Sequence, residues 1–140
     1  MKNILVVSGH PNPSASLANK TILESLRTAF PQAQFRELAS LVKEGRFDPV
    51  PEQEALEKAD VIVLQFPFNW YSVPGLLKTW IDEVLLHGFA YGSGAKLSGK
   101  TVLLSITAGA PGRPTNATAL PVTRYLSSSR RSPSPPKPAA

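Results

Sequence analysis

The loop Ser8–Asn19 (SGHPNPSASLAN) places hydrogen-bond donors where an apolar run passes into a helical pattern. Unpaired backbone N–H groups and the helix dipole at such a position favour an anion. The side chains of His10, Ser14 and Ser16 would add donors. The same residue types also form turns and cap helices, and spacing alone leaves both interpretations open. The loop lacks the Gly-Lys-Ser/Thr ending of a Walker sequence, so it is not a nucleotide-binding P-loop.

Aromatic side chains follow a second apolar run. Phe68, Asn69, Trp70 and Tyr71 offer flat rings and backbone amides, which suit a planar heteroaromatic ligand. The alternative is that Trp70 and Tyr71 only hold the loop against its neighbours. A third loop, Thr107–Pro111 (TAGAP), follows another apolar run. If the three runs are parallel strands, the three loops meet at one edge of a sheet and form a ligand site.

Other chemistries find little support in the sequence. The chain contains no cysteine and two histidines. Disulfides, thiolate metal sites and cysteine nucleophiles are therefore excluded. No Ser-His-Asp set and no cluster of histidine and carboxylate at metal-ligand spacing can be assembled, so we expect no metal. Redox chemistry would need a bound cofactor.

The elements that must position these loops alternate between strands and helices. Continuous apolar runs predict strands covered on both faces at Lys2–Ser8, Asp60–Phe66 and Lys100–Thr107, with a shorter strand at Gln34–Leu38. Strands separated by helices indicate a doubly wound α/β domain with a parallel sheet and right-handed crossovers.

Three helices are expected between the strands. Ser16 caps the first, which Pro31 stops, and Pro49–Ala59 predicts a charged surface helix. Pro74 occupies the first position of the third, which Gly88 ends, so that His87 falls in its last turn. Its apolar face consists of Leu77, Trp80, Ile81, Val84 and Leu85.

The net charge of +5 is unevenly distributed. Residues 1–112 carry ten Lys/Arg and ten Asp/Glu, whereas residues 113–140 carry five Lys/Arg and no acid. We therefore expect a neutral domain at 1–112, a disordered Pro/Ser/Arg-rich tail at 113–140, and no nucleic-acid partner for the domain. The first apolar run is too short for a signal peptide or a membrane span, which favours a cytoplasmic protein without membrane insertion.

Three segments, His10–Asn19, Glu52–Gly92 and Lys100–Pro111, resemble the flavodoxin-like NAD(P)H:quinone oxidoreductases. This family includes the modulator-of-drug-activity reductases and the ancillary flavoproteins of potassium efflux. Gln65–Gly92 meets the pattern QFPxxWYSxPxLLKxWIDEVxxxGFAYG throughout. The resemblance implies a flavodoxin-like three-layer fold, FMN or FAD as cofactor, and a homodimer. It also implies two-electron hydride transfer from NADH or NADPH to a quinone or other small acceptor in a ping-pong cycle.

The resemblance also assigns site residues. The flavin phosphate would be held by His10, Ser16, Leu17, Ala18 and Asn19. The isoalloxazine would be lined by Phe68, Asn69, Trp70, Tyr71, Thr107, Ala108, Gly109 and Ala110. The last loop reads Thr-Ala-Gly-Ala where the family usually has Thr-Thr-Gly-Gly. No catalytic residue is assigned.

The family pattern is not visible after Gly112. Its last strand and helix are missing from the sequence, and we interpret this as a frameshift near Gly112, because Arg113–Ala119 permits a family-like peptide in a shifted frame. Such a product would expose the strand at 100–107 as an edge and be unstable and impaired. Three alternatives stay open: a regulatory flavoprotein subunit of a glutathione-gated potassium-efflux system, a non-functional product, and a nucleic-acid binder acting through its basic tail.

Overall fold

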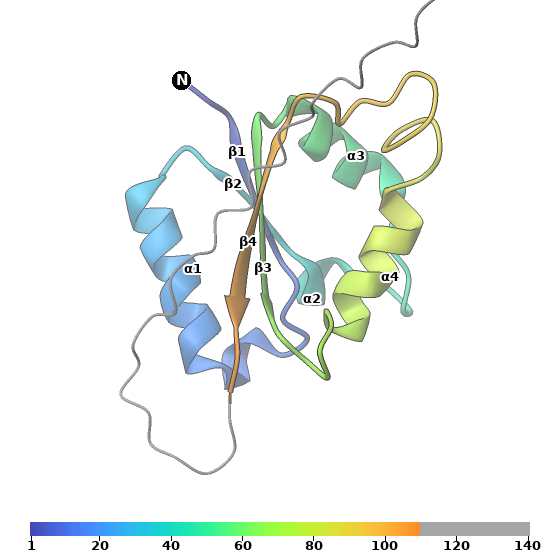
Figure 1. Ribbon diagram of the computed structural model, residues 1–140. Coiled ribbons are helices and arrows are strands. Elements are labelled where there is room, and N and C mark those ends of the chain that lie inside the picture. The colour runs from blue at the N-terminus through green and yellow to red at the C-terminus, as the bar shows by residue number, and fades with distance from the viewer. Residues whose placement is uncertain (110–140) are drawn as a thin grey trace, which may run out of the picture.

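Four parallel strands form the centre of the computed structural model, which describes residues 1–109 (Figure 1). The strands are β1 (Ile4–Ser8), β2 (Gln34–Glu37), β3 (Val61–Pro67) and β4 (Thr101–Thr107), in the order β2-β1-β3-β4. This order is that of the first four strands of a flavodoxin-like sheet. The expected flavodoxin-like α/β fold with a parallel sheet is therefore confirmed.

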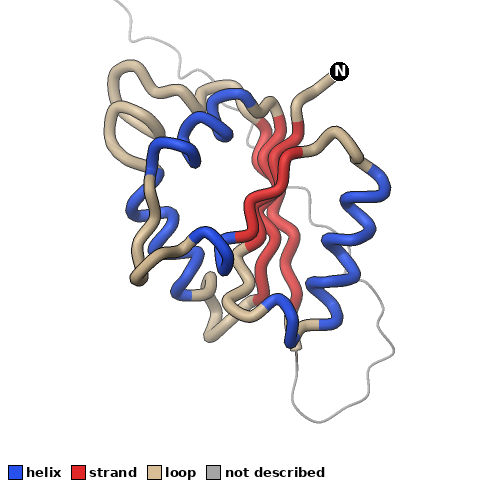
Figure 2. The backbone as a smooth tube through the Cα atoms, turned by 180° about the vertical axis from the view of Figure 1, so that it is seen from behind, coloured by secondary structure: helices blue, strands red, loops and turns tan. Residues whose placement is uncertain are grey.

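Helices cover both faces of the sheet (Figure 2). A short 3-10 helix, η1 (Pro13–Ala15), leads into α1 (Leu17–Ala29), which lies on one face. The other face carries α2 (Leu38–Leu41), α3 (Pro49–Lys58) and α4 (Gly75–Val84). In the described part of the chain, no helix is long and apolar enough to cross a membrane.

The strands separate two hydrophobic cores because their side chains alternate between faces. Under α1, Val6 and Val63 pack with Leu23. The larger core lies under α3 and α4 and contains fully buried Leu5, Leu56 and Leu77, together with Trp80 at 1% exposure. Burial on both faces explains why β1 and β3 read as uninterrupted apolar runs.

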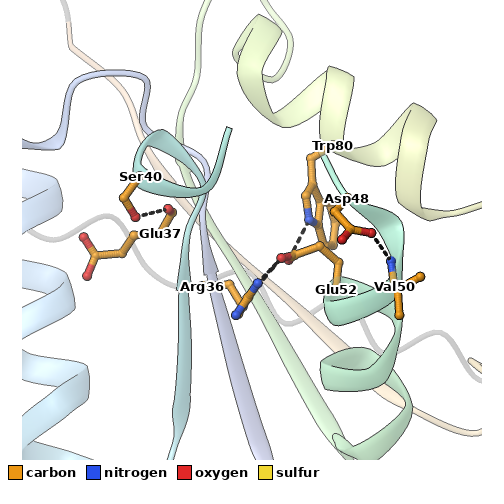
Figure 3. A network of polar contacts seen from close by, with 7 residues as sticks. All are labelled: Arg36, Glu37, Ser40, Asp48, Val50, Glu52 and Trp80. Carbon is orange, nitrogen blue, oxygen red and sulfur yellow. Dashed lines mark hydrogen bonds and ion pairs between the residues drawn. The ribbon is translucent and has the colours of Figure 1, made fainter. Parts of the chain in front are cut away.

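A buried polar network ties the second core together (Figure 3). Glu52 of α3 is 2% exposed, and its carboxylate accepts hydrogen bonds from two side chains. The Nε1–H of Trp80 donates to Oε2 at 3.0 Å, and the Nε–H of Arg36 donates to Oε1 at 3.1 Å. The Arg36 guanidinium also forms an ion pair with the carboxylate. Strand β2 and helices α3 and α4 are thereby joined through one side chain.

The helix boundaries differ from expectation in two places. Pro74 is the N-cap of α4 rather than its first residue, and the helix ends at Val84 instead of at Gly88. The backbone of Leu85 leaves the helical region, and Gly88 belongs to a later turn with φ +85°. His87 is therefore not in the last helical turn. Its ring lies edge-to-face with Tyr91 at 5.3 Å between centroids.

The expectation of a surface helix at Pro49–Ala59 was wrong for one of its faces. Glu52, Ala55 and Leu56 are buried, since positions three and four apart face the sheet. The remaining charged residues of α3 are on the exposed side. The short helix α2 was not expected, because four residues give no readable period.

Candidate functional site

Four side chains join the carboxyl ends of β3 and β4 to the start of α1. Ser16 caps α1, its Oγ accepting from the backbone N–H of Asn19 at 3.3 Å and from Asn19 Nδ2 at 2.7 Å. Asn19 is 2% exposed, and its Nδ2 also donates to Thr107 Oγ1 at 3.2 Å. The Nε2–H of Gln65, which is fully buried, donates to Asn19 Oδ1. This network fixes the first and third loops against β3.

The start of α1 offers backbone donors beside this network. Lys20 N–H makes the first intrahelical bond, to Ser16 O at 3.1 Å, and the Asn19 N–H is satisfied by the cap. None of the hydrogen bonds among the described residues uses the N–H of Leu17 or Ala18, and both residues are exposed. Two free N–H groups at the positive end of a thirteen-residue helix form a site for an anion.

His10 lies in the same loop as a neutral donor. Its Nδ1 accepts from the backbone N–H of Asn12 at 2.9 Å. Burial lowers the pKa of the His10 imidazole from its ordinary value of 6.5. The lowered pKa favours the neutral ring, and because Nδ1 accepts a hydrogen bond, the proton of that ring is on Nε2. His10 can donate one hydrogen bond to an anion without bringing a full positive charge.

The aromatic loop is a tight turn with strained backbone. Asn69 and Ser72 exchange two backbone hydrogen bonds, of 3.0 and 2.9 Å. The two residues between them, Trp70 and Tyr71, have φ of +46° and +61°, as in a type I′ turn. Glycine and asparagine usually occupy these positions, and another residue type costs about 1–2 kcal/mol at each. The turn holds the two rings 94% and 89% exposed.

Two backbone hydrogen bonds bring the loops to the same edge. The Phe68 N–H donates to Thr107 O at 2.7 Å, and the Gly9 N–H donates to Gln65 O at 2.8 Å. Gly9 is required for close approach, since a Cβ there would lie 2.9 Å from Leu77 Cβ. The Phe68 ring meets the Tyr71 ring edge-to-face at 6.2 Å. The site thus combines an anion-binding helix start with exposed flat rings.

Two hollows lie away from the three loops. One of about 300 Å³ is lined by residues that include Asn3, Gln34 and Lys58, at the amino ends of the strands. It is lined by none of the loop residues. We place the site at the carboxyl edge because donors, rings and strained backbone coincide there. Among residues 1–109, no three His, Asp or Glu side chains cluster as a metal site would require.

The family of the chain follows from a match that covers most of its length. Residues 2–129 match the family model described as flavodoxin-like fold. The chain belongs to the flavodoxin-like fold family. The match includes the three loops and the strands that carry them.

Solved structures of this fold resemble the chain over about three quarters of its residues. General stress protein 14 from Treponema denticola, in complex with FMN, is 37% identical with a TM-score of 0.73, covering 78% of this chain and 63% of its own. A protein named thermophilic tryptophan halogenase, from Streptomycin violaceusniger, is 42% identical with a TM-score of 0.70, covering 76% and 62%. An NADPH-quinone reductase from P. pentosaceus is 29% identical with a TM-score of 0.66, covering 80% and 62%. The chain therefore spans 62–63% of the length of these relatives.

The expected site residues fall into three groups in this flavodoxin-like chain. His10, Ser16, Leu17, Ala18 and Asn19 lie together at the start of α1, although the side chain of Asn19 is engaged internally. Phe68, Asn69, Trp70 and Tyr71 form the exposed turn. Thr107 is the last residue of β4, and Ala108 and Gly109 follow it. Ala110, the tail and the proposed frameshift lie outside the described residues. Flavin contacts by any of these residues stay a prediction.

Gln65 was not predicted as a member of the site. It was assigned only to the end of a buried strand. Its burial beside Asn19 leaves its Oε1 without a hydrogen-bond partner among the described residues. The available signal was a lone amide in the otherwise apolar run DVIVLQF. A buried amide needs partners, so its place near the loops could have been inferred.

Proposed function

We propose that the chain binds a flavin across its three loops and uses it for NAD(P)H-dependent reduction of a quinone or similar small acceptor. The single observation that carries this proposal is the coincidence of two features at one sheet edge. The start of α1 presents free N–H groups, and the strained turn of Trp70 and Tyr71 presents rings. A ligand with a phosphate and a flat ring system fits both. One solved relative is in complex with FMN, and another is named NADPH-quinone reductase.

The residues present fit the phosphate of a flavin mononucleotide. The N–H groups of Leu17 and Ala18 are free to bind its oxygens, and the Nε2–H of His10 adds a donor in the same loop. The Ser16 Oγ is already an acceptor for Asn19, so its hydroxyl hydrogen can donate to the ligand. Asn19 would act indirectly, because its side chain holds Ser16 and Thr107 in place.

The ring system would lie against the aromatic turn. A bound flavin accepts two electrons as a hydride from a nicotinamide and passes them to an acceptor. The role of this chain is to bind, orient and shield the reacting ring. Trp70 and Tyr71 would provide stacking area, and backbone amides of the turn and of residues 107–109 could bond to the edge of the ring. In this proposal nicotinamide and quinone use one face in turn, which gives ping-pong kinetics.

The remaining expectations belong to the same proposal. The resemblance supports a cytoplasmic enzyme that acts as a homodimer, with FMN or FAD as cofactor. The chain spans less than two thirds of its solved relatives, so its activity depends on whether residues 1–140 suffice.

The binding experiment uses the fluorescence of the flavin. FMN is titrated with the full chain, and we expect quenching on binding because the ring stacks on an indole. Riboflavin, which lacks the phosphate, should bind more weakly. Trp70→Ala should weaken FMN binding by about 2- to 10-fold, the factor that corresponds to 0.5–1.5 kcal/mol for an aromatic stacking pair.

A matched control separates stacking from general damage. Phe30→Ala removes an exposed aromatic ring of 44% exposure at the far end of α1. It should leave FMN affinity unchanged. A folded chain that neither quenches FMN nor prefers it to riboflavin contradicts flavin binding. A chain that binds FMN but does not oxidise NADH or NADPH with a quinone present contradicts the proposed reaction only.

A further inference from the structure

Gln65 is the one polar residue of β3, and its side chain is fully buried. Its Nε2–H donates to Oδ1 of Asn19 in α1, which is itself buried. Burying an amide in an apolar strand costs free energy, and a hydrogen bond offsets only part of that cost. An apolar side chain would fill the same space without it. We therefore assign the amide a role beyond packing.

The hydrogen bond from Gln65 determines which way the Asn19 amide faces. An asparagine carbonyl only accepts hydrogen bonds, and its NH2 group only donates them. Because Gln65 holds the Asn19 Oδ1, the Nδ2 group faces the other way. It donates to Ser16 Oγ at 2.7 Å and to Thr107 Oγ1 at 3.2 Å. With the Asn19 amide reversed, both hydroxyls would face a carbonyl oxygen and donate their hydrogens to it.

The direction of these bonds leaves the hydroxyl hydrogen of Ser16 for a ligand. Ser16 Oγ accepts from the Asn19 backbone N–H at 3.3 Å and from Nδ2, which uses both acceptor positions of a hydroxyl oxygen. Its hydrogen must therefore donate elsewhere. The contact from Thr107 Oγ1 to Asn19 Oδ1, at 3.4 Å, is long compared with the usual O–H···O distance of about 2.5–3.0 Å, so this hydrogen is also available.

We propose that Gln65 is a positioning residue for phosphate recognition, because it orients Asn19 so that the Ser16 hydroxyl donates to a bound phosphate. This inference rests on the proposed flavin function and specifies how that site recognises the phosphate end of the ligand. The Ser16 hydroxyl then joins the N–H groups of Leu17 and Ala18 at the start of α1, so that phosphate oxygens meet donors. Gln65 is fully buried and acts only through Asn19.

The phosphate preference of the chain, defined as the riboflavin Kd divided by the FMN Kd, measures this role. Gln65→Met keeps the length of the side chain but removes the donor, so Asn19 can turn its carbonyl toward Ser16. The preference should then fall by at least about 10-fold, the factor for one hydrogen bond to a charged group. The riboflavin Kd should change by less than about 2-fold. The Gly9 N–H still bonds to the backbone carbonyl at position 65, which keeps the loop in place.

Two further variants separate the orientation of Asn19 from general damage. Gln65→Glu restores a donor at about pH 5.5, because burial keeps the carboxyl protonated and its O–H replaces the Nε2–H. It should retain the phosphate preference of the unmodified chain at the same pH to within about 2-fold. Gln53→Met is the matched control: it removes an amide of α3 that donates to Val84 O at 2.8 Å, away from the three loops. It should leave the phosphate preference unchanged.

Inorganic phosphate tests the same role without a flavin. In an NMR titration of the full chain, phosphate should shift the amide signals of Leu17 and Ala18 more than potassium chloride of equal ionic strength does. Gln65→Met should weaken this phosphate binding, whereas Gln53→Met should not. If these results hold but FMN does not bind, the flavin proposal fails and the role of Gln65 stands.

Three results would overturn the role of Gln65 and leave flavin binding intact. The first is an equal phosphate preference in Gln65→Met and the unmodified chain. The second is a loss of FMN and riboflavin affinity by the same factor in Gln65→Met, which would make Gln65 a purely structural residue. The third is a loss of preference in Gln65→Glu at low pH as large as that in Gln65→Met.

Discussion

The Glu52 carboxylate joins β2, α3 and α4 behind the site, and its removal should lower the stability of the fold. It accepts from the Trp80 indole at 3.0 Å and from the Arg36 Nε at 3.1 Å (Figure 3). Glu52→Gln keeps the size and one acceptor oxygen but removes the charge. The Arg36 guanidinium then remains beside a neutral amide, with its side chain only 19% exposed.

The expected loss follows from the burial of the two partners. Breaking a fully buried ion pair from one side costs about 3–5 kcal/mol, because the remaining charge is left unpaired. Arg36 retains some contact with water and the glutamine oxygen still accepts one bond, so we expect about 2–3 kcal/mol for Glu52→Gln. Glu52→Ala also leaves the Trp80 N–H unsatisfied, which adds about 1–3 kcal/mol. Domains of this kind are stable by roughly 5–15 kcal/mol, so both losses are large.

Urea unfolding followed by tryptophan fluorescence measures this directly. The chain has two tryptophans, and Trp70 is already 94% exposed, so the change on unfolding comes mainly from Trp80. With a urea dependence of about 1–3 kcal/mol per molar, the loss of about 2–3 kcal/mol for Glu52→Gln should lower the midpoint by about 0.7–3 M. Glu54→Gln, on the exposed side of the same helix, should move it by less than about 0.3 M.

Two outcomes would refute the reasoning. Equal midpoints for Glu52→Gln and Glu54→Gln would mean that the buried carboxylate contributes nothing as a charge. Arg36→Met combined with Glu52→Gln should be less destabilised than the sum of the two single variants, because neither leaves an unpaired buried charge in the presence of the other. Additive losses would show that the two side chains do not act as a pair.

Two further predictions concern backbone positions at the site, and both are measured by the same urea assay. Gly9→Ala should destabilise the fold by about 1–3 kcal/mol, because the added Cβ would overlap Leu77. The control Gly75→Ala, where a Cβ would have no atom within 4 Å, should be neutral or stabilising by up to about 1 kcal/mol. Equal effects of the two substitutions would contradict the close approach of Gly9 to Leu77. The double variant Trp70→Asn/Tyr71→Gly should stabilise the free chain by about 2–4 kcal/mol, because it removes the strain of two positive φ angles. Any stabilising contact that the two rings make in the free chain would reduce this gain. The same variant should abolish the quenching of FMN fluorescence. A double variant that is less stable than the unmodified chain would show that the turn is not strained.

The sheet could be predicted from the sequence because each strand buried on both faces leaves an uninterrupted apolar run. The runs ending at Ser8, Phe66 and Thr107 became β1, β3 and β4, and parallel pairing then required their loops to share an edge. Ser16 was identified as a cap because a serine before a helical period has few other local roles, and its Oγ does accept from the N3 amide.

Other features depend on contacts between distant segments, which a local pattern does not contain. The burial of Glu52 requires Arg36 and Trp80 from two other elements, so the charge-rich sequence of α3 predicts only an exposed helix. The amide of Gln65 is buried in β3, and its hydrogen-bond partner, Asn19, comes from α1. The end of α4 at Val84 is set by the loop that follows, whereas the sequence offers Gly88 as the nearest obvious stop.

The aromatic turn is the clearest case in which contacts with other elements override the backbone preference of individual residues. Nothing in the letters FNWY predicts positive φ at Trp70 and Tyr71, since both residue types disfavour it. The conformation persists because its two ends are fixed: Phe68 donates to Thr107 of β4, and the chain after Ser72 enters α4 through Pro74. The free chain therefore carries both backbone strain and two solvated rings at one place. A ligand that covers those rings removes their apolar surface from water but does not change the strained φ angles. The strain is therefore the free-energy cost of orienting the rings before the ligand binds. This separation explains why stability and flavin affinity should change in opposite directions at this turn.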